Sequence, residues 1–274
     1  MLLRRTYGAP VAAVSMSVEG ETAAYAAAVV ANGGTVSDAR VAILNTFIRT
    51  EKASGAWALT DDYWGLWAES EAQALTSLKQ LRLATVVAAP TFTADRDYAL
   101  NGSTQYINTG FVPSTHAAAM TATSIHLEVY ERAELSANTY AAGVLNSANR
   151  AITVRPRSAG SAFIQAGSAA ATFTLPSASS LGLTQGGRNG AAVTDVYGSK
   201  NGVSMTRAVD PAAVGASLPA NSIFLGAYNN AGTAAGFRAA SIGYAATGAA
   251  LSQAQQLARY NAVQAWATAV GAQV

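Results

Sequence analysis

The clearest hydrophobic pattern in the chain lies at residues 125–130, which read Ile-His-Leu-Glu-Val-Tyr. Apolar and polar side chains alternate there, as they do in a strand with one buried face. Similar short runs, separated by Gly, Asn, Ser and Pro, continue from about residue 91 to residue 250, which indicates an all-β region. Further strands are predicted at residues 98–100, 106–108, 140–145, 151–154, 162–165, 172–175, 181–184, 192–197, 202–205, 223–227 and 237–244. Asn201-Gly202 predicts a hairpin turn, because both residues accept positive φ.

The first ninety residues show helical patterns instead. Residues 21–31 are good helix formers followed by Asn-Gly-Gly, which suits a left-handed cap. A second helix is predicted to begin after Ser37, a good N-cap, and to end at Gly55. A turn at Asp61-Asp62, a short strand at residues 63–67 and a short helix at residues 70–78 are expected to follow.

A helical period returns at the C-terminal end of the chain. Ser252 is a natural N-cap, and a rough apolar stripe continues to residue 270. Three regions are therefore expected. They are a helical and mixed anchoring region at 1–90, a β-sandwich at 91–250 and a C-terminal helix at 251–274 packed on the sandwich.

Composition narrows the possible functions. Only 12% of the 274 residues are charged and half are apolar, which is unlike a disordered chain. The 17 basic and 15 acidic residues form no basic stripe, so nucleic-acid binding is not expected. No apolar run approaches the roughly 20 residues that span a bilayer, and the N-terminal apolar stretch is too short for a signal peptide. Cysteine is absent, which excludes disulfides and thiolate chemistry.

Two phrases carry a family resemblance. Residues 90–98 (PTFTADRDY) and 101–111 (NGSTQYINTGF) resemble the opening of concanavalin A-like (laminin-G-like) jelly-roll domains and, more closely, virion proteins of tailed phages. Residues 223–243 with Leu251-Ser252 are similar to the closing strands and final helix of that family, and residues 36–78 to its helical lead-in. The resemblance implies a mainly β fold, a jelly-roll β-sandwich with an N-terminal helical extension and a C-terminal helix. It includes no catalytic motif.

Glycoside hydrolysis is the chemistry that this fold would most readily suggest, and it needs two carboxylates flanking a sugar. Glu128 and Glu131 are the nearest match, but residues three apart on a strand point to opposite faces, so we expect a solvated strand edge. His116 and His126 are the two histidines of the chain, and His126 is expected to form a solvated pair with Glu128. We therefore expect no enzyme activity and no cofactor.

Binding chemistry has two candidate sets. Asp95, Asp97 and Asn101 supply oxygens for a calcium site, although such residues more often form turns. The Gly-rich residues 185–190 lack the setting of a phosphate-binding loop and are interpreted as a hairpin; the phage resemblance implies that Arg188 is structural at a sandwich edge.

An aromatic group offers two interpretations. Its rings could stack on a glycan or could join the helical lead-in to the sandwich, and we favour the second. The group consists of Trp57, Tyr63, Trp64 and Trp67.

The leading hypothesis is a non-enzymatic phage virion protein, made in the host bacterial cytoplasm, of the tail-fibre or adhesin type. Head decoration of the capsid and a carbohydrate-binding module for host surface glycan are the alternatives, and a glycosidase is a third. Expected partners are other virion proteins, further copies in a homo-oligomer such as a trimer, and host surface carbohydrate. Neither nucleic acid nor membrane insertion is expected.

Overall fold

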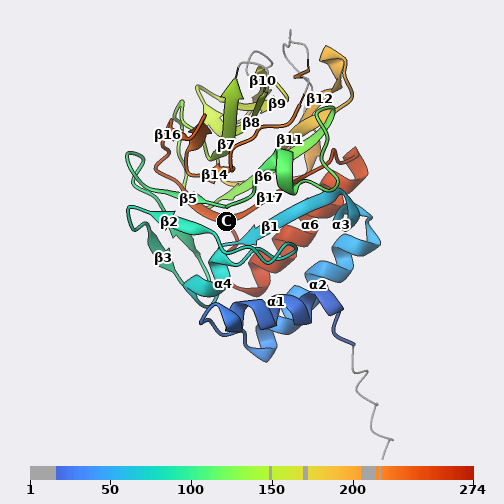
Figure 1. Ribbon diagram of the computed structural model, residues 1–274, viewed down its shortest axis with the longest axis vertical. Coiled ribbons are helices and arrows are strands. Elements are labelled where there is room, and N and C mark those ends of the chain that lie inside the picture. The colour runs from blue at the N-terminus through green and yellow to red at the C-terminus, as the bar shows by residue number, and fades with distance from the viewer. Residues whose placement is uncertain (1–16, 148–149, 169–171, 205–213, 216) are drawn as a thin grey trace, which may run out of the picture.

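The computed structural model describes residues 17–147, 150–168, 172–204, 214–215 and 217–274. Two β-sheets face each other, and helices cover the outer face of one of them (Figure 1). The expected fold class, a mainly β sandwich with an N-terminal helical extension and a C-terminal helix, is confirmed.

The helices begin and end close to the predicted residues. Ser37 accepts a hydrogen bond from the Arg40 backbone N–H, and Ser252 forms a capping box with Gln255. Gly55 has φ 77°, which ends the second helix as predicted. The helical elements are α1 (Gly20–Ala31), α2 (Asp38–Ala53), α3 (Ala56–Leu59), α4 (Glu71–Leu75), α5 (Pro113–His116), the 3-10 helix η1 (Val193–Asp195) and α6 (Gln253–Ala269).

One sheet, here the helix-covered sheet, has the strand order β13-β12-β11-β6-β17-β4-β3, with β1 also paired to β17. The predicted hairpin at Asn201-Gly202 joins β12 to β13, with φ of 50° and 76°. The strands of this sheet are β13 (Val203–Ser204), β12 (Val196–Lys200), β11 (Gly182–Asn189), β6 (Ser124–Glu131), β17 (Ser241–Gly248), β4 (Asp97–Ala99), β3 (Thr91–Thr93) and β1 (Thr60–Gly65).

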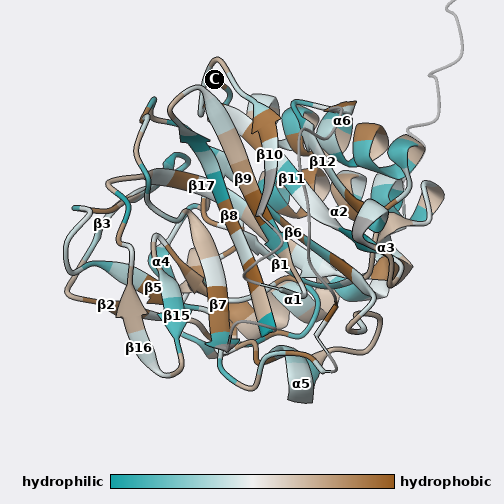
Figure 2. Ribbon diagram, turned by 90° about the horizontal axis from the view of Figure 1, so that it is seen from above, coloured by the Kyte–Doolittle hydropathy of each residue, from teal (hydrophilic) through white to brown (hydrophobic). Residues whose placement is uncertain are grey.

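The second sheet, here the uncovered sheet, has the order β10-β9-β8-β7-β14-β5-β2. β15 adds to β7 in parallel and pairs with β16, whereas the other pairs are antiparallel. In Figure 2, α2, α3 and α6 gather at one side of the sandwich and β7, β8 and β9 lie side by side. Its strands are β10 (Thr172–Pro176), β9 (Ser161–Ala166), β8 (Arg150–Ser158), β7 (Ala142–Ser147), β14 (Phe224–Leu225), β5 (Tyr106–Asn108), β2 (Thr85–Val87), β15 (Tyr228–Asn230) and β16 (Thr233–Ala235).

The lead-in is part of the sandwich and not a separate anchoring region. β1 pairs with β17 from Thr60 to Gly65, and β2 pairs with β5, so the first ninety residues contribute a strand to each sheet. α2 also packs against α6. The expected boundary at residue 90 therefore does not separate two structural units.

Two apolar cores follow from the strand alternation. On β6, Ile125, Leu127 and Val129 point into the core between the sheets. Tyr130, on the opposite face, belongs to a second core between the helix-covered sheet and the helices, together with Phe47 of α2. The helix-covered sheet is consequently buried on both faces, which is why polar residues of β6 are buried as well.

The doublet Asp61-Asp62, predicted as a turn, lies inside strand β1. Asp61 accepts backbone N–H bonds from Ala118, Ala119 and Met120 at 2.7 to 3.0 Å. Asp62 Oδ1 accepts three more, from the backbone of residues 63, 79 and 80 at 2.9 to 3.2 Å. Each buried carboxylate thus accepts hydrogen bonds from backbone N–H groups of a neighbouring loop that would otherwise need water. Local turn propensity does not predict this role of Asp.

We expect Asp62→Asn to stabilise the protein in a pH-dependent way. Burial raises the pKa of Asp62 from 3.8 to about 6, partly offset by its hydrogen bonds. The folded protein therefore binds the proton on Asp62 more tightly than the unfolded chain does. This proton binding stabilises the folded state at low pH, and the stabilisation is lost as the pH rises from 4 through 6. Asn keeps the acceptor without the charge, so the free energy of unfolding at pH 8 should rise by about 1 to 3 kcal/mol, with a smaller gain at pH 4.

Urea unfolding at pH 4, 6 and 8 measures this difference, with Asp38→Asn on the exposed start of α2 as the charge-loss control. A gain for Asp62→Asn that is equal at all three pH values would contradict the expectation.

Candidate functional site

Glu128, one of the two residues nearest to a glycosidase carboxylate pair, lies in a buried ion cluster under the helices. Arg259 of α6 donates to Glu128 Oε1 and, from Nη2 at 2.6 Å, contacts Glu51 Oε2 of α2. Tyr244 donates to Glu128 at 2.8 Å, and Tyr63 donates to Glu51 at 3.1 Å. All five side chains are fully buried. A single guanidinium therefore holds two carboxylates from distant parts of the chain.

Electrostatics keeps Glu128 and Arg259 of this cluster ionised. Desolvation raises the pKa of Glu128, but Arg259, His126 and the hydrogen bonds from Gln185 and Tyr244 together outweigh it, so the pKa lies below its usual value. The pKa of Arg259 is raised well above normal despite its own desolvation, because Glu128 and Glu51 face it. A carboxylate that is ionised, paired and closed to solvent is not placed to donate a proton to a glycosidic oxygen.

Glu131 occupies the opposite face of β6, as predicted, but it is not solvated. It pairs with Arg238, whose Nη2 lies 2.9 Å from Glu131 Oε2, and both side chains are fully buried. The prediction of a solvated strand edge for Glu128 and Glu131 is therefore wrong. β6 is a central strand that is covered on both faces, by the second sheet on one side and by helices on the other. Each of its carboxylates pairs with an arginine from later in the chain, Glu128 with Arg259 and Glu131 with Arg238.

His126 is also less exposed than expected. His126 lies on the same face as Glu128, but it is buried and donates from Nδ1 to the Ala249 carbonyl. Burial lowers its pKa to about 4, so it is neutral at pH 7. The prediction of a solvated pair is wrong. His116 accepts the Val112 backbone N–H at 2.8 Å and so closes the turn of α5.

The aromatic group lies in the cores and presents no face to a glycan. Trp57 is 8% exposed, and Tyr63, Trp64 and Trp67 are fully buried. Trp64 belongs to the core between the sheets, whereas the other three lie under the helices. Trp67 stacks on Tyr244 with ring centroids 5.9 Å apart. The interpretation that these rings stack on a glycan is therefore wrong. The alternative, that they pack in the core, agrees with the structure.

The calcium candidates do not converge. Asp95 pairs with Arg40, and Asp97 pairs with Arg132 at 2.6 Å. Asn101 Oδ1 accepts the backbone N–H groups of residues 103, 104 and 105, which is an Asx-type turn. In the described ranges no group of three or more His, Cys, Asp or Glu side chains could hold a metal ion. No helix there is long and apolar enough to cross a membrane either.

The Gly-rich residues 185–190 are mostly strand β11 and not a hairpin. Arg188 is fully buried, donating from Nε to the Ala166 carbonyl of β9 at 2.8 Å and from Nη1 to the Ala192 carbonyl at 2.9 Å. It connects the two sheets from inside the sandwich, so its role is structural but not at an edge.

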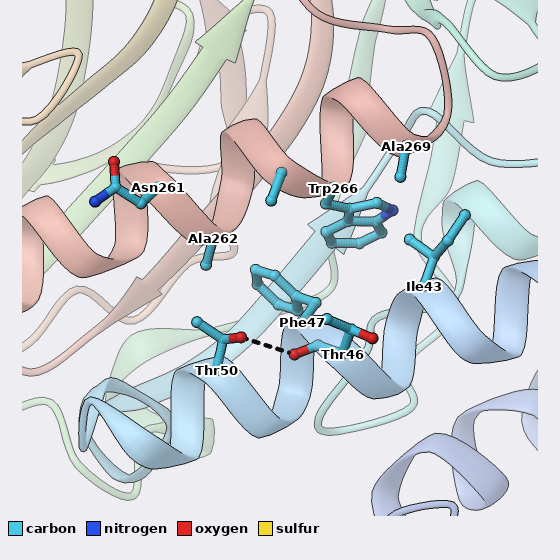
Figure 3. Close-up of a pocket in the computed structure, with 9 residues that line it drawn as sticks. Ile43, Thr46, Phe47, Thr50, Asn261, Ala262, Trp266 and Ala269 are labelled. Atoms are coloured by element: carbon cyan, nitrogen blue, oxygen red, sulfur yellow. Dashed lines mark hydrogen bonds between the residues drawn. The ribbon is translucent and has the colours of Figure 1, made fainter. Parts of the chain in front are cut away.

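The helical layer carries an apolar groove that the sequence patterns did not indicate. It lies between α2 and α6 and has a volume of about 250 Å³ (Figure 3). Phe47 and Trp266 form its floor, with ring centroids 4.8 Å apart, and both are almost fully buried. No charged side chain lines it. The lining residues are Ile43, Thr46, Phe47, Thr50, Asn261, Ala262, Ala265, Trp266 and Ala269.

Comparison with known proteins finds solved structures of low similarity. No family model matches the chain, and no curated protein matches it. Domain 4 of AbnA, a GH43 extracellular arabinanase from Geobacillus stearothermophilus, in complex with arabinotriose, is similar over 73% of this chain and 97% of that domain, with 16% identity and a TM-score of 0.43. Trypanosoma rangeli sialidase in complex with sialic acid is similar over 81% of this chain and 38% of the sialidase, with 11% identity and a TM-score of 0.45. At this level of similarity the comparisons carry no argument about this chain.

We expect Arg259→Met to destabilise the protein by about 3 to 5 kcal/mol, because Glu51 and Glu128 would remain buried without a partner. The matched control is Arg49→Met on α2, whose side chain is 42% exposed and lies 3.6 Å from Glu19. A surface pair of this kind contributes at most about 1 kcal/mol. Urea denaturation of both variants measures the change in the free energy of unfolding. An equal decrease for the two variants would show that the buried cluster contributes no more to stability than the surface pair.

Proposed function

We propose that the chain is a non-enzymatic structural component of a tailed-phage particle, of the tail-fibre or adhesin type, that assembles through the groove between α2 and α6. Head decoration remains the alternative position on the particle. The phage assignment is supported by the phrases at residues 90–98 and 101–111, and the assembly step by the groove. The proposed setting is the particle, after synthesis in the host cytoplasm.

The occupant we propose for the groove is a second copy of the chain. A symmetric contact brings the same surface of both copies together, so charged side chains of one sign would repel each other there. The rim avoids this problem, because Thr46, Thr50 and Asn261 are uncharged and exposed. Ala265 and Ala269 are exposed small side chains on the α6 side, which allow a second backbone to approach closely.

The groove also offers what an interface core needs. Aromatic residues in the centre of a patch surrounded by a polar rim are the usual anatomy of protein interfaces. Here Phe47 and Trp266 lie at the floor, while the rim is made of hydroxyl and amide groups. In a two-fold dimer the grooves of the two copies would face each other. In a ring such as a trimer the groove of each copy would instead contact a different surface of the next copy.

We expect the protein to be oligomeric at micromolar concentration and Ala265→Arg to shift it to monomers, because an arginine in the groove would lose its hydration on association. Mass photometry measures the distribution of species. Ala27→Arg, on the exposed side of α1 away from the groove, is the matched control and should remain oligomeric. Wild-type protein that is monomeric throughout, or loss of assembly in both variants, would contradict the proposal.

The particle assignment has its own test. Gold-labelled antibody raised against the purified protein should decorate the tails of phage particles carrying this gene when they are viewed by electron microscopy. Label on the capsid would favour head decoration over a tail position. Particles that carry no label anywhere, although the antibody binds the purified protein, would overturn the virion proposal.

A further inference from the structure

A second cavity lies at the edge of the helix-covered sheet, where η1 and β12 meet the start of α6. Its volume is about 380 Å³, within the range of roughly 300 to 1,000 Å³ that is usual for small-ligand sites. We call it the edge cleft. Most of its lining side chains carry an oxygen or an amide. The lining residues are Asn189, Thr194, Asp195, Val196, Tyr197, Gly198, Ser204, Leu251, Ser252, Gln253 and Gln256.

The backbone holds a carboxylate in this cleft. Asp195 Oδ2 accepts the Ala192 backbone N–H at 2.7 Å, which fixes the side chain at the end of η1. Gly190 has φ 141°, and a Cβ atom there would lie 2.1 Å from Asp195 Oδ2. Glycine is therefore required at this position for the carboxylate to occupy its place.

A buried acceptor beside the cleft has no partner. Gln256 is 4% exposed and lines the cleft; its Nε2 donates to the Leu251 carbonyl at 2.9 Å. Its Oε1 is buried and finds no hydrogen-bond donor in the part of the chain that the structure describes. Because Oε1 is closed to solvent, the Gln256 side chain forms part of the wall of the cleft and is not counted as a ligand contact.

The charges in the cleft select a neutral ligand. The N-terminus of α6, at Ser252 and Gln253, is positively polarised and disfavours a cation. Among the lining residues that the structure describes, Asp195 is the charged one, and it disfavours an anion. A ligand with several hydroxyl groups meets both conditions, because a hydroxyl can donate to Asp195 and can accept from the Gln253 side-chain amide. Tyr197, which is partly exposed, adds a ring against which C–H groups can pack.

We propose that the edge cleft binds a neutral polyhydroxylated ligand, a saccharide, with Asp195 and Gln253 as its principal polar contacts. This replaces the buried aromatic group as the place where sugar would bind. The inference does not rest on assembly through the α2/α6 groove, because the cleft and the groove share no lining residue.

The test is saturation-transfer NMR with the full-length protein and four neutral sugars, glucose, galactose, mannose and N-acetylglucosamine, each at tens of millimolar. Ethylamine and inorganic phosphate serve as charged probes. We expect at least one sugar to bind and neither charged probe to compete with it. The absence of binding by all four sugars, or binding of a charged probe alone, would overturn the proposal.

Variants locate the binding. Asp195→Asn should weaken the sugar affinity roughly tenfold, the effect of losing a hydrogen bond to a charged group, and Gln253→Ala by about threefold, because its amide is neutral and exposed. The matched controls, Asp38→Asn on α2 and Gln273→Ala near the C-terminus, should bind as the wild type does, and melting temperatures verify folding. If sugar binds but the cleft variants behave like the controls, the cleft is not the site. Ala265→Arg should keep full sugar affinity even as a monomer, so failure of assembly and failure of sugar binding are distinguishable.

Discussion

The contact on which the structure depends is the one between Arg259 and the two carboxylates of Glu51 and Glu128. It joins α6, α2 and β6, which are the C-terminal helix, the lead-in and a central strand of the helix-covered sheet. Placing three charges in an apolar layer is unfavourable unless each has its partners. Tyr63 donates to Glu51, and Tyr244 and Gln185 donate to Glu128, so the cluster fixes how the helices sit on the sheet. The groove and the edge cleft both use α6, and both therefore depend on this placement.

Much of the fold could be predicted from local patterns. Ser37 and Ser252 mark helix starts by a mechanism that acts within one turn, and Asn201-Gly202 marks a hairpin in the same way. The alternation at residues 125–130 identified β6 and the correct opposite faces of Glu128 and Glu131. These features depend on near neighbours in the sequence, and the family resemblance added the expectation of a β-sandwich, which local patterns alone do not contain.

The polar residues were harder to interpret, because their surroundings come from distant segments. The sequence around Glu128 predicts a surface residue, but α6 covers it in the structure. The sequence around Asp61 predicts a turn, but its carboxylate binds the backbone of residues 118–120. The groove was missed for the same reason, since Phe47 and Trp266 are far apart in the sequence. Glycine at 190 followed by Asp195 was the one local signal of the edge cleft, and it could be recognised only once φ at that glycine was known.

The pairing of the chain's two ends has a consequence for how the protein forms. β1 pairs with β17, α2 packs on α6, and Glu51 meets Arg259 across a separation of 208 residues. Contacts between such distant segments close late, because loop entropy must be overcome first. During synthesis Glu51 and Glu128 leave the ribosome before their counter-ion exists, and the outer face of the sheet stays open to other chains. Final closure of this layer is thus postponed until residue 259 emerges, which makes protection by a chaperone most useful in that interval.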